Sequence, residues 1–489
     1  MKRYDAVIIG AGPNGLSAAI ALAQAGCAVL VLEAKETIGG GCRSAELTLP
    51  GFIHDPCATI HSLGVTSPFF RSLPLKKYGL EWIFPPASLA HPLDDGSAVI
   101  LERSVEKTSQ SLGEDGKAYQ RLFSPLVENW GKLSKELLGP VPIPPRHPLL
   151  LARFGLIALR PAASVAAGRF KGKRAQALFA GLGAHSIQPL DNIMTAAFGL
   201  MLGTSAHAAG WPVARGGSQM VVNALAQYLV SLGGEIATNH PVKSQADLPD
   251  TTVALFDVAP KQLLEIMGDR LPEGYRERLK RYRYGPGVFK VDFALDGPIP
   301  WKAADCLRAA TAHLGGTLEE IIQGERAVGE GEHPQHPFVL LAQQTLFDPR
   351  RAPDGKHTVW AYCHVPNGST VDMTERIEAQ IERFAPGFRD RIIAKATRSA
   401  VEIEAYNPNY IGGDINGGVQ DLTQHFTRPT ARIVPYSTPL EGIYLCSSST
   451  PPGGGVHGMS GYFAAKAALS MLGKKASALI EFQPAEAGL

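Results

Sequence analysis

The apolar positions at the start of the chain predict a strand, a helix and a second strand. Residues 4–9 form a short apolar run rich in β-branched side chains, which is typical of a buried strand. Residues 16–24 are rich in Ala and Leu, as in a helix, and Gly26 stands where a helix C-cap favours glycine. Residues 28–32 form a second apolar run that ends at Glu33. This order indicates a βαβ unit of the Rossmann type.

The rest of the chain changes from helical to strand-like patterns. Residues 105–210 are mainly helical in pattern. Residues 276–434 contain alternating runs, such as 287–295 and 358–364, that suit an antiparallel sheet. Within this region a turn-rich stretch ends in Asp414, for which a turn-stabilising role is expected rather than a place in an active site.

One predicted helix is unusually apolar. Residues 149–159 follow a Pro-rich connection at 140–148, and the basic run of Arg169, Lys171, Lys173 and Arg174 comes after them. An apolar helix with basic flanks can lie on a membrane interface, but the pattern also fits a core helix with solvated ends, which we favour. No apolar run reaches the roughly 18 residues of a spanning helix, so none is expected.

The first predicted strand runs into a glycine-rich turn with the spacing of a dinucleotide-binding fingerprint. Gly10 permits a tight turn, Gly12 leaves room for a pyrophosphate, and Gly15 lets the helix pack closely on the strand. The free N–H groups of the helix N-terminus attract phosphate. Glu33, at the end of the second strand, is placed to accept hydrogen bonds from ribose hydroxyls, and its charge disfavours the 2′-phosphate of NADP.

A second glycine-rich turn favours FAD over NAD. Residues 39–41 are three consecutive glycines, followed by Cys42 and Arg43. The turn offers backbone donors, and the Arg43 guanidinium is expected to reach the diphosphate and the nearby ribityl chain. An NAD domain does not need this additional clamp.

Composition and charge bound the remaining possibilities. A chain of 489 residues exceeds one hydrophobic core, so two or three structural units are expected. A net charge of +2 gives no reason to expect a nucleic-acid partner. The six cysteines lack CxxC spacing, which argues against a redox dithiol or a metal site and favours reduced thiols in the cytoplasm. No signal peptide is expected, because Asp5 and the glycines interrupt the first apolar run. Peripheral membrane contact and a homo-oligomer stay open.

The C-terminal part carries the most specific motif. A strand at 442–447 leads into the loop Ser-Ser-Thr-Pro-Pro-Gly-Gly-Gly-Val-His-Gly-Met at 448–459, and a helix follows at 460–472. With the Asn-Pro-Asn-Tyr-Ile-Gly-Gly-Asp stretch at 407–414, this loop resembles the phytoene dehydrogenase-like FAD-dependent oxidoreductases of the carotenoid desaturase and amine oxidase superfamily. The similarity is greatest to the subgroup called pyridine nucleotide-disulphide oxidoreductase domain-containing protein 2.

The resemblance implies further cofactor contacts. It gives the Val242 backbone a contact to the adenine and places the C-terminal loop and its helix N-terminus at the pyrimidine edge of the flavin. The superfamily usually ends its last strand in Gly-Asp, where this chain has serines, so the Ser449 hydroxyl is expected to replace that acid. The predicted FAD-binding residues are Gly10, Gly12, Pro13, Asn14, Gly15, Glu33, Ala34, Gly40, Gly41, Cys42, Arg43, Val242, Ser449, Gly458 and Met459.

Together these patterns predict an α/β fold, with a Rossmann-type FAD-binding domain and a discontinuous α+β substrate domain. Residues 1–105, 210–275 and 435–489 are assigned to the FAD-binding domain, and residues 106–209 and 276–434 to the substrate domain.

The resemblance also implies an activity. It indicates hydride transfer between flavin N5 and a hydrophobic small molecule, such as an isoprenoid, polyene or lipid. His457 and His61 are the candidate acid/base groups, although a structural role fits each equally well. Two alternatives stay open: an amine-oxidase-like flavoenzyme, which would need an aromatic cage over the flavin, and a flavin-stabilised binding or assembly protein without turnover.

Overall fold

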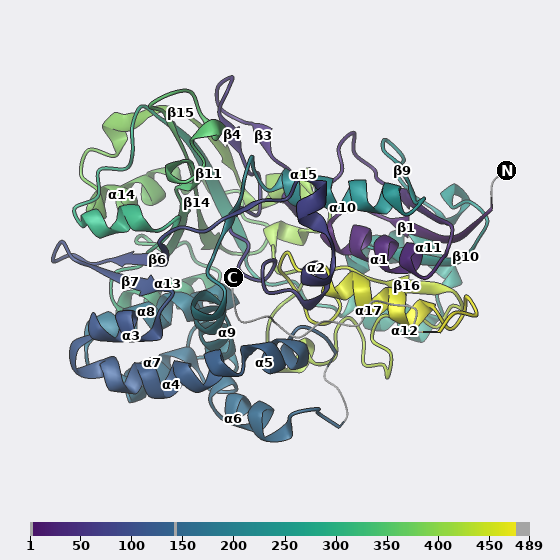
Figure 1. The fold of residues 1–489 in the computed structure, drawn as a ribbon, viewed down its shortest axis with the longest axis horizontal. Coiled ribbons are helices and arrows are strands. Elements are labelled where there is room, and N and C mark those ends of the chain that lie inside the picture. Colours follow the sequence, from purple (N-terminus) through teal and green to yellow (C-terminus); the bar gives the residue numbers. More distant parts are fainter. Residues whose placement is uncertain (1–2, 141–143, 476–489) are drawn as a thin grey trace.

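The computed structural model describes residues 3–140 and 144–475, and one end of the molecule is built on a parallel sheet (Figure 1). Its five strands lie in the order β16–β10–β1–β2–β9, so β1 is central. They are β1 (Tyr4–Ile9), β2 (Val29–Leu32), β9 (Glu235–Ala237), β10 (Thr251–Phe256) and β16 (Ile443–Leu445). The predicted βαβ unit is confirmed, and the strand predicted at 442–447 is present as β16.

Helices cover both faces of this sheet because its strands are apolar on both sides. Ala6 and Ile8 of β1 pack into one core, and Val7 and Ile9 pack into the other. The first core contains α1 (Pro13–Gln24), α10 (Gln219–Ser231) and α17 (Met459–Ala468), and the second contains α11 (Pro260–Met267) and α12 (Glu273–Lys280). The carboxyl ends of the parallel strands therefore meet at one edge, where such sheets bind ligands.

The other end of the molecule contains a sheet of seven strands in the order β15–β11–β14–β13–β12–β6–β7. Its pairings are antiparallel except that between β12 and β6. The strands are β6 (Ala87–Pro92), β7 (Ala98–Glu102), β11 (Gly287–Leu295), β12 (Thr311–Leu314), β13 (Val339–Ala342), β14 (His357–Val365) and β15 (Ile392–Arg398). The expected antiparallel sheet over 276–434 is thus present, with two additional strands.

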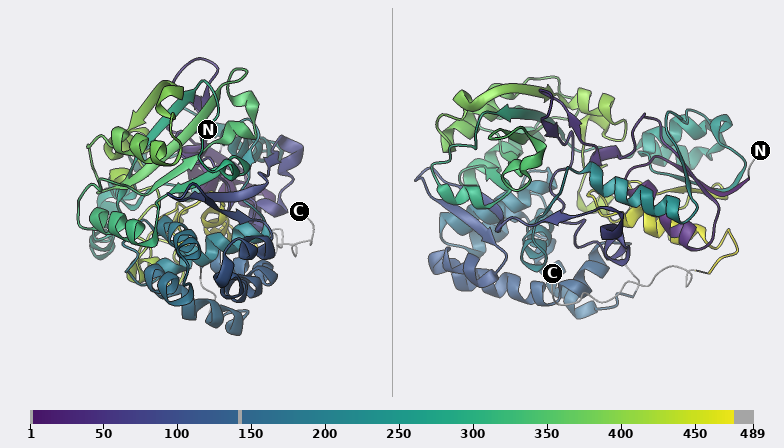
Figure 2. Two further views of the ribbon diagram at one scale, coloured as in Figure 1. Left: turned by 90° about the vertical axis from the view of Figure 1, so that its left-hand side faces the viewer. Right: turned by 45° about the horizontal axis from the view of Figure 1, so that its top comes forward.

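A layer of helices lies beneath this sheet (Figure 2). It comprises α3 (Val105–Gln110), α4 (Gly116–Glu128), α5 (Trp130–Leu137), α6 (Pro148–Ala158), α7 (Ala162–Arg169), α8 (Lys173–Gly183) and α9 (Thr195–Ala208). Val288, Leu340 and Tyr362 of the sheet share a core with this layer, whereas Phe289, Leu341 and Cys363, one position away, pack into the opposite core. The sheet thus turns every second side chain towards the helices.

The structure corrects one predicted domain boundary. Residues 1–105 were assigned to the FAD-binding domain, but β6 and β7, between Ala87 and Glu102, belong to the seven-stranded sheet. Ala90 of β6 lies opposite Ala312 of β12, so the chain crosses to the substrate side before residue 87.

The structure also overturns the interpretation of the apolar helix as a core helix. In α6 only Phe154 and Ala158 are buried. Leu149 and Leu156 are 87% and 77% exposed. The helix packs on α5 and α9 along a narrow stripe, because its apolar side chains surround the whole helix and only one side meets the protein.

Within residues 3–140 and 144–475, none of the helices alone combines the length and the apolar character of a membrane-spanning segment. Helices α6 and α7 reach that length and composition only together, with a bend of 91° between them.

Candidate active site

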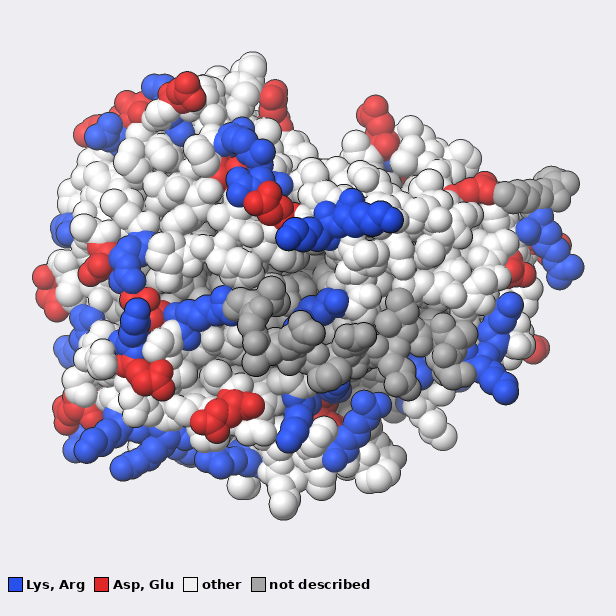
Figure 3. Space-filling model, viewed as in Figure 1, with Lys and Arg blue, Asp and Glu red and all other residues white. Residues whose placement is uncertain are grey.

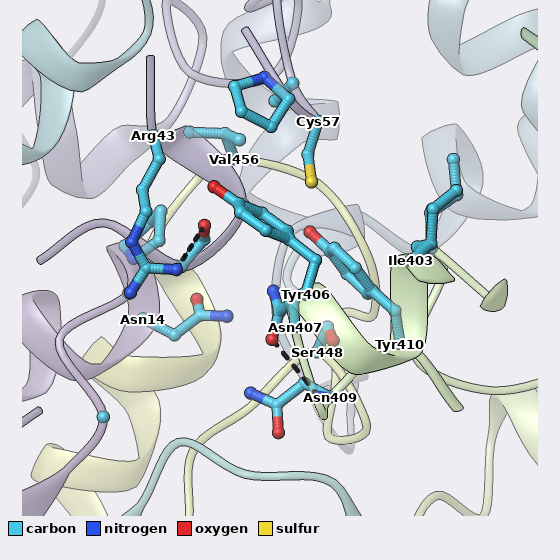
Figure 4. Close-up of a pocket in the computed structure, with 18 of the residues that line it drawn as sticks. Asn14, Arg43, Cys57, Ile403, Tyr406, Asn407, Asn409, Tyr410, Ser448 and Val456 are labelled. Carbon is cyan, nitrogen blue, oxygen red and sulfur yellow. Dashed lines mark hydrogen bonds between the residues drawn. The ribbon is translucent and has the colours of Figure 1, made fainter. Parts of the chain in front are cut away.

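A cavity of about 500 Å³ joins the two ends of the molecule. Its nucleotide end lies at the carboxyl ends of β1, β2 and β10, and its inner end lies against the seven-stranded sheet. Ten of the predicted FAD-binding residues line the nucleotide end: Gly10, Gly12, Pro13, Asn14, Glu33, Ala34, Gly40, Gly41, Arg43 and Val242. Figure 4 shows the residues where the two ends of the cavity meet.

The fingerprint glycines are needed because Asp257, the residue after β10, approaches the start of α1. Asp257 Oδ2 accepts a hydrogen bond of 2.9 Å from Gly15 N. A Cβ atom on Gly12 would lie 2.9 Å from the same oxygen, and one on Gly15 would lie 2.0 Å from the Gly10 carbonyl oxygen. Burial raises the pKa of the Asp257 carboxyl group to about 7, with the Gly15 N–H opposing the shift and the Glu33 charge adding to it.

The nucleotide end fits a diphosphate. Gly12 is the N-cap of α1 and offers no side-chain cap, so the first turn of the helix is open towards the cavity. Gly40 and Gly41 form the facing wall without side chains. Asn14 is buried, and its Oδ1 has no hydrogen-bond partner in the described part of the chain. These residues would hold the diphosphate of FAD between the two glycine turns.

Glu33 and Arg43 form a buried pair at the ribose end. Glu33 Oε2 accepts from Ala11 N at 2.9 Å, and Oε1 accepts from Lys35 N at 3.0 Å and from Arg43 Nη2 at 3.1 Å. Arg43 also donates to the Thr37 carbonyl oxygen through Nε and Nη2. These bonds hold the second glycine turn against Glu33, and Arg43 also lines the cavity, so its reach to the diphosphate stays a prediction. Glu33 retains one free lone pair, on Oε2, for a ribose hydroxyl group.

Four other predicted cofactor residues do not line the cavity. Ser449 donates to the Gly417 carbonyl oxygen at 2.8 Å, and its neighbour Ser448 lines the cavity instead. Gly458 and Met459 start α17, which packs on α1, while the loop reaches the cavity through Gly455 and Val456. The buried Cys42 is the fourth. The loop is thus near the predicted place, but other residues carry the contact.

Gly15 also lies outside the lining, and its role is the predicted one of close packing between helix and strand. Val242 lines the nucleotide end together with Pro241. The preceding residue, His240, donates its N–H to the Glu33 carbonyl oxygen at 2.9 Å. This bond ties the Val242 segment to the ribose end of the cavity.

The two predicted acid/base histidines are held in structural contacts. Ser218 Oγ donates to the Ala58 carbonyl oxygen, so His61 Nε2 is the donor in its 2.9 Å bond to Ser218. His457 Nδ1 accepts from Met459 N at 3.0 Å. Burial lowers the pKa of each imidazole to about 4, and neither ring lines the cavity. The prediction that they exchange protons with a substrate therefore has no support from the geometry.

The comparisons with known proteins agree with this site. A family model described as an NAD(P)-binding Rossmann-like domain matches residues 8–73. The chain is 27% identical to pyridine nucleotide-disulfide oxidoreductase domain-containing protein 2 of Mus musculus, over 94% of this chain and 92% of that protein. It is 24% identical to one of the subunits of the limonene dehydrogenase of Castellaniella defragrans, over 97% and 96%. It is 23% identical to a lycopene-forming phytoene desaturase of Paracoccus sp., over 97% and 98%.

Solved structures share the same two-part architecture. Putrescine oxidase superposes with a TM-score of 0.60 at 17% identity, over 96% of this chain and 99% of that one. The relatives, the fold and the paired glycine turns agree on one cofactor and one class of protein. The chain is an FAD-dependent oxidoreductase.

The inner end of the cavity in this oxidoreductase was not predicted from the sequence. Alternate residues of the seven-stranded sheet form one wall, with Lys290 and Val288 from β11 and Trp360 and Tyr362 from β14. Lys290 is buried and forms an ion pair with Asp292, and its Nζ lies 5.5 Å from the centre of the Trp360 ring. Burial lowers the pKa of Lys290, and the Asp292 charge opposes the shift.

Two tyrosines stand where the nucleotide end meets the inner end. Tyr406 ends α15 (Ala400–Tyr406), and Tyr410 is the N-cap of the short helix Ile411–Gly413. Figure 4 shows their rings side by side below Cys57. The Arg398 guanidinium lies 4.4 Å from the centre of the Tyr406 ring. Asp414 accepts from three backbone N–H groups, those of Gly285, Asn416 and Gly418, so its predicted turn role is confirmed.

All six cysteines are free thiols in the structure. Five are buried, and the sixth, Cys57, is partly exposed at the cavity wall. Burial raises the pKa of Cys57 to about 11, although the neighbouring cations of Lys290 and Arg398 oppose the shift. The Cys57 thiol is therefore held in the protonated form, which is a poor nucleophile.

Proposed function

We propose that this oxidoreductase moves hydride between a predominantly apolar substrate and the flavin. The observation that carries the proposal is the lining of the inner end, which is largely aliphatic and aromatic: Ile187, Leu202, Trp211, Val288, Leu340, Trp360, Tyr362, Ile403 and Ile415. When bound, FAD would supply a hydride acceptor or donor at N5. Burial of apolar surface is worth about 25 cal/mol per Å², so a hydrocarbon binds such a wall without ionic anchors.

The names of full-length relatives support this substrate class. Limonene and phytoene, which appear in two of those names, are both hydrocarbons. The chain aligns with each of these relatives over 97% of its length, so the similarity includes the substrate side as well as the nucleotide side.

The charges around the cavity argue against a small cationic amine. Among the described residues that line it, the carboxylates are Glu33 and Asp257, and both lie at the nucleotide end. The charged side chain at the inner end is Lys290, a cation. The tyrosines and Trp360 supply aromatic surface, as an amine oxidase would require. An ammonium ion would find no free carboxylate among the described residues there, because Asp292 is already paired with Lys290.

The first prediction concerns substrate preference. Anaerobic mixing of the FAD-loaded protein with terpenes, polyenes, acyl lipids and amines is expected to bleach the oxidised flavin band with apolar compounds only. The reason is the apolar wall beside Lys290. Stopped-flow absorbance measures the bleaching rate, and a spectral shift without bleaching would indicate binding without turnover. Rapid bleaching by putrescine or another small charged amine would overturn the proposal.

We further propose that this enzyme is cytoplasmic and collects its substrate at a membrane surface through α6. The exposed leucines of this helix are accompanied by the exposed basic residues Arg146, Arg153 and Arg160. Figure 3 shows Lys and Arg side chains along the lower edge of the molecule, where Figure 1 places the helical layer. Helix α6 packs on α9, and Leu202 of α9 lines the inner end of the cavity. This arrangement suits an interfacial helix on an anionic bilayer.

The second prediction tests this face. The double variant Leu149→Ser/Leu156→Ser is expected to bind vesicles of phosphatidylcholine with phosphatidylglycerol at least about tenfold more weakly, because each buried leucine contributes about 1.5–3 kcal/mol. Co-sedimentation measures the binding. Val230→Ser, which changes a residue of α10 that is 58% exposed, is the matched control and should bind as the native chain does. Unchanged vesicle binding, with a dimer that dissociates only in the double variant, would assign the face to self-association.

A further inference from the structure

Two histidines form a hydrogen-bonded pair at the far end of the cavity. His185, after α8, lines the inner end and is partly exposed to it. His185 Nε2 and His313 Nε2 of β12 are 3.0 Å apart. His185 Nδ1 has no hydrogen-bond partner that the described residues supply, whereas Nε2 is fixed by His313. The imidazole at the cavity wall therefore has one nitrogen that no group in the described ranges uses.

Thr311 supplies a second unused polar atom in the cavity lining. Thr311 is 4% exposed and lines the cavity, and its Oγ1 has no partner among the described residues. Thr311 and His313 lie two positions apart on β12, so their side chains emerge on the same face of the sheet, about 7 Å apart. The Trp211 ring packs against both histidines, with centroid distances of 6.1 Å to His185 and 6.3 Å to His313.

From these observations we infer a subsite for a single oxygen atom at the inner end of the cavity, with His185 Nδ1 and Thr311 Oγ1 as its hydrogen-bond partners. The substrate is then an apolar molecule that carries one hydroxyl or carbonyl group. The inference deepens the proposed function and rests on it. Leaving the buried Thr311 Oγ1 without a partner is costly, so the site favours a ligand that satisfies it and also reaches the unused nitrogen of His185.

The histidine pair suits either kind of oxygen. Burial lowers the pKa of His185 to about 3, with the nearby His364 adding to the shift, and burial lowers the pKa of His313 well below its usual range. Both rings are therefore neutral. If His313 donates to His185, then His185 Nδ1–H donates to the substrate; in the reverse tautomer Nδ1 accepts from a hydroxyl group. Thr311 Oγ1 supplies the complementary donor or acceptor.

His313 acts as a positioning residue for His185. Its ring lies against Gly181 of α8, where a Cβ atom would come within 2.8 Å of His313 Nδ1. The Phe338 ring lies on another side, with its centroid 5.3 Å from that of His313. Close packing therefore fixes the orientation in which His313 holds His185 Nε2.

Crystals of the FAD-loaded protein provide a direct test that needs no turnover. They are soaked separately with 2-propanol, acetone and cyclohexane. The oxygen atoms of 2-propanol and acetone are expected within hydrogen-bond distance of both His185 Nδ1 and Thr311 Oγ1. Cyclohexane is expected along the aliphatic wall away from these two atoms. Oxygen-bearing probes that avoid these residues, or cyclohexane bound between them, would overturn the subsite.

Variants supply the solution test. Thr311→Val keeps the shape of the side chain and removes its hydroxyl group. This variant is expected to bind menthol and menthone about tenfold more weakly and to bind p-menthane with unchanged affinity. Perturbation of the flavin spectrum measures the binding. Thr311→Ser restores the hydroxyl group and should recover the affinity. Thr204→Val is the matched control, because Thr204 is also buried with an unpartnered Oγ1 but does not line the cavity.

The outcomes separate the subsite from the proposed function. Equal weakening of all three ligands by Thr311→Val, or the same loss in Thr204→Val, would mean that the hydroxyl group has only a structural role. Oxygen-bearing probes at the subsite, together with no flavin bleaching by any apolar compound, would leave the subsite standing and remove the proposed reaction. If apolar compounds bleach the flavin equally fast in the native chain and in Thr311→Val, the proposed reaction stands and the subsite is removed.

Discussion

Replacing Gly12 with valine is expected to give a colourless protein that no longer holds FAD. A Cβ atom at this position would lie 2.9 Å from Asp257 Oδ2 and 3.9 Å from the Gly40 Cα atom. The branches of valine would then crowd Gly40 and the nucleotide end of the cavity, which both glycines line and where the diphosphate is expected. Displacing the Asp257 carboxyl group would also break its bond to Gly15 N at the start of α1. We expect FAD affinity to fall by more than about 100-fold, or about 2.7 kcal/mol.

The measurement is the flavin absorbance of the purified protein and the mass spectrum of what heat denaturation releases. The native chain should release FAD in a one-to-one ratio. Gly168→Val is the control, because Gly168 lies on the exposed surface of α7 and a Cβ atom there meets no neighbour within 4 Å. Circular dichroism separates loss of cofactor from loss of fold. A Gly12→Val protein that stays yellow would mean that the diphosphate lies elsewhere.

The nucleotide end was predictable because its signals are local. Gly10, Gly12, Gly15 and Glu33 lie within one short segment, and each has a physical reason to be the residue it is. The part that the sequence did not reveal is Asp257, whose carboxyl group meets Gly15 across 242 positions. Such a contact depends on which strand pairs with β1, and no pattern inside either segment reports it.

The inner end was missed for a related reason. In the strand 287–295 the polar residues Lys290 and Asp292 alternate with apolar ones, and this was a usable signal that one face of a buried strand is polar. It could not reveal that Lys290 and Trp360 share a wall, because that follows from strand pairing. His61 and His457 were chosen for their nearness to glycine loops, but nearness in sequence does not fix which way a buried ring points.

The predictions of the domain boundary and of the burial of α6 were wrong because both features depend on tertiary partners. The pattern of residues 87–102 is that of a hairpin and fits either sheet, and only the neighbouring β12 decides the matter. Helix α6 is apolar on every side, which normally indicates burial. Its exposed leucines show that one side of the helix has no partner in the described part of the molecule.

Replacing Arg351 with alanine is expected to cause the largest loss of stability. Arg351 is 1% exposed and donates to Asp55 Oδ2 at 2.7 Å through Nη2. Asp55 also accepts from Ser44 Oγ and from Ser218 N, which leads into α10. Removing the cation leaves a buried carboxylate without a counter-ion, which typically costs about 3–5 kcal/mol. Arg308→Ala, which breaks the more exposed pair with Glu102, should cost less than about 1 kcal/mol.

The pH dependence of this loss distinguishes the ion pair from simple packing. Burial alone would raise the pKa of Asp55, but Arg351 and the hydrogen bonds from Ser44 and Ser218 lower it overall. The folded pKa then lies below the unfolded value of about 3.9, so the stabilisation is present above that pH and is lost as the pH falls through the folded pKa. Urea denaturation should therefore show that the difference in the free energy of unfolding between the native chain and Arg351→Ala becomes smaller below about pH 4. A difference that is constant with pH would assign the loss of stability to the missing volume of the arginine side chain. Asp55 contacts both Ser218, at the start of α10, and Arg351, beside the seven-stranded sheet. Loss of the ion pair should therefore also weaken the contact between the two ends of the cavity.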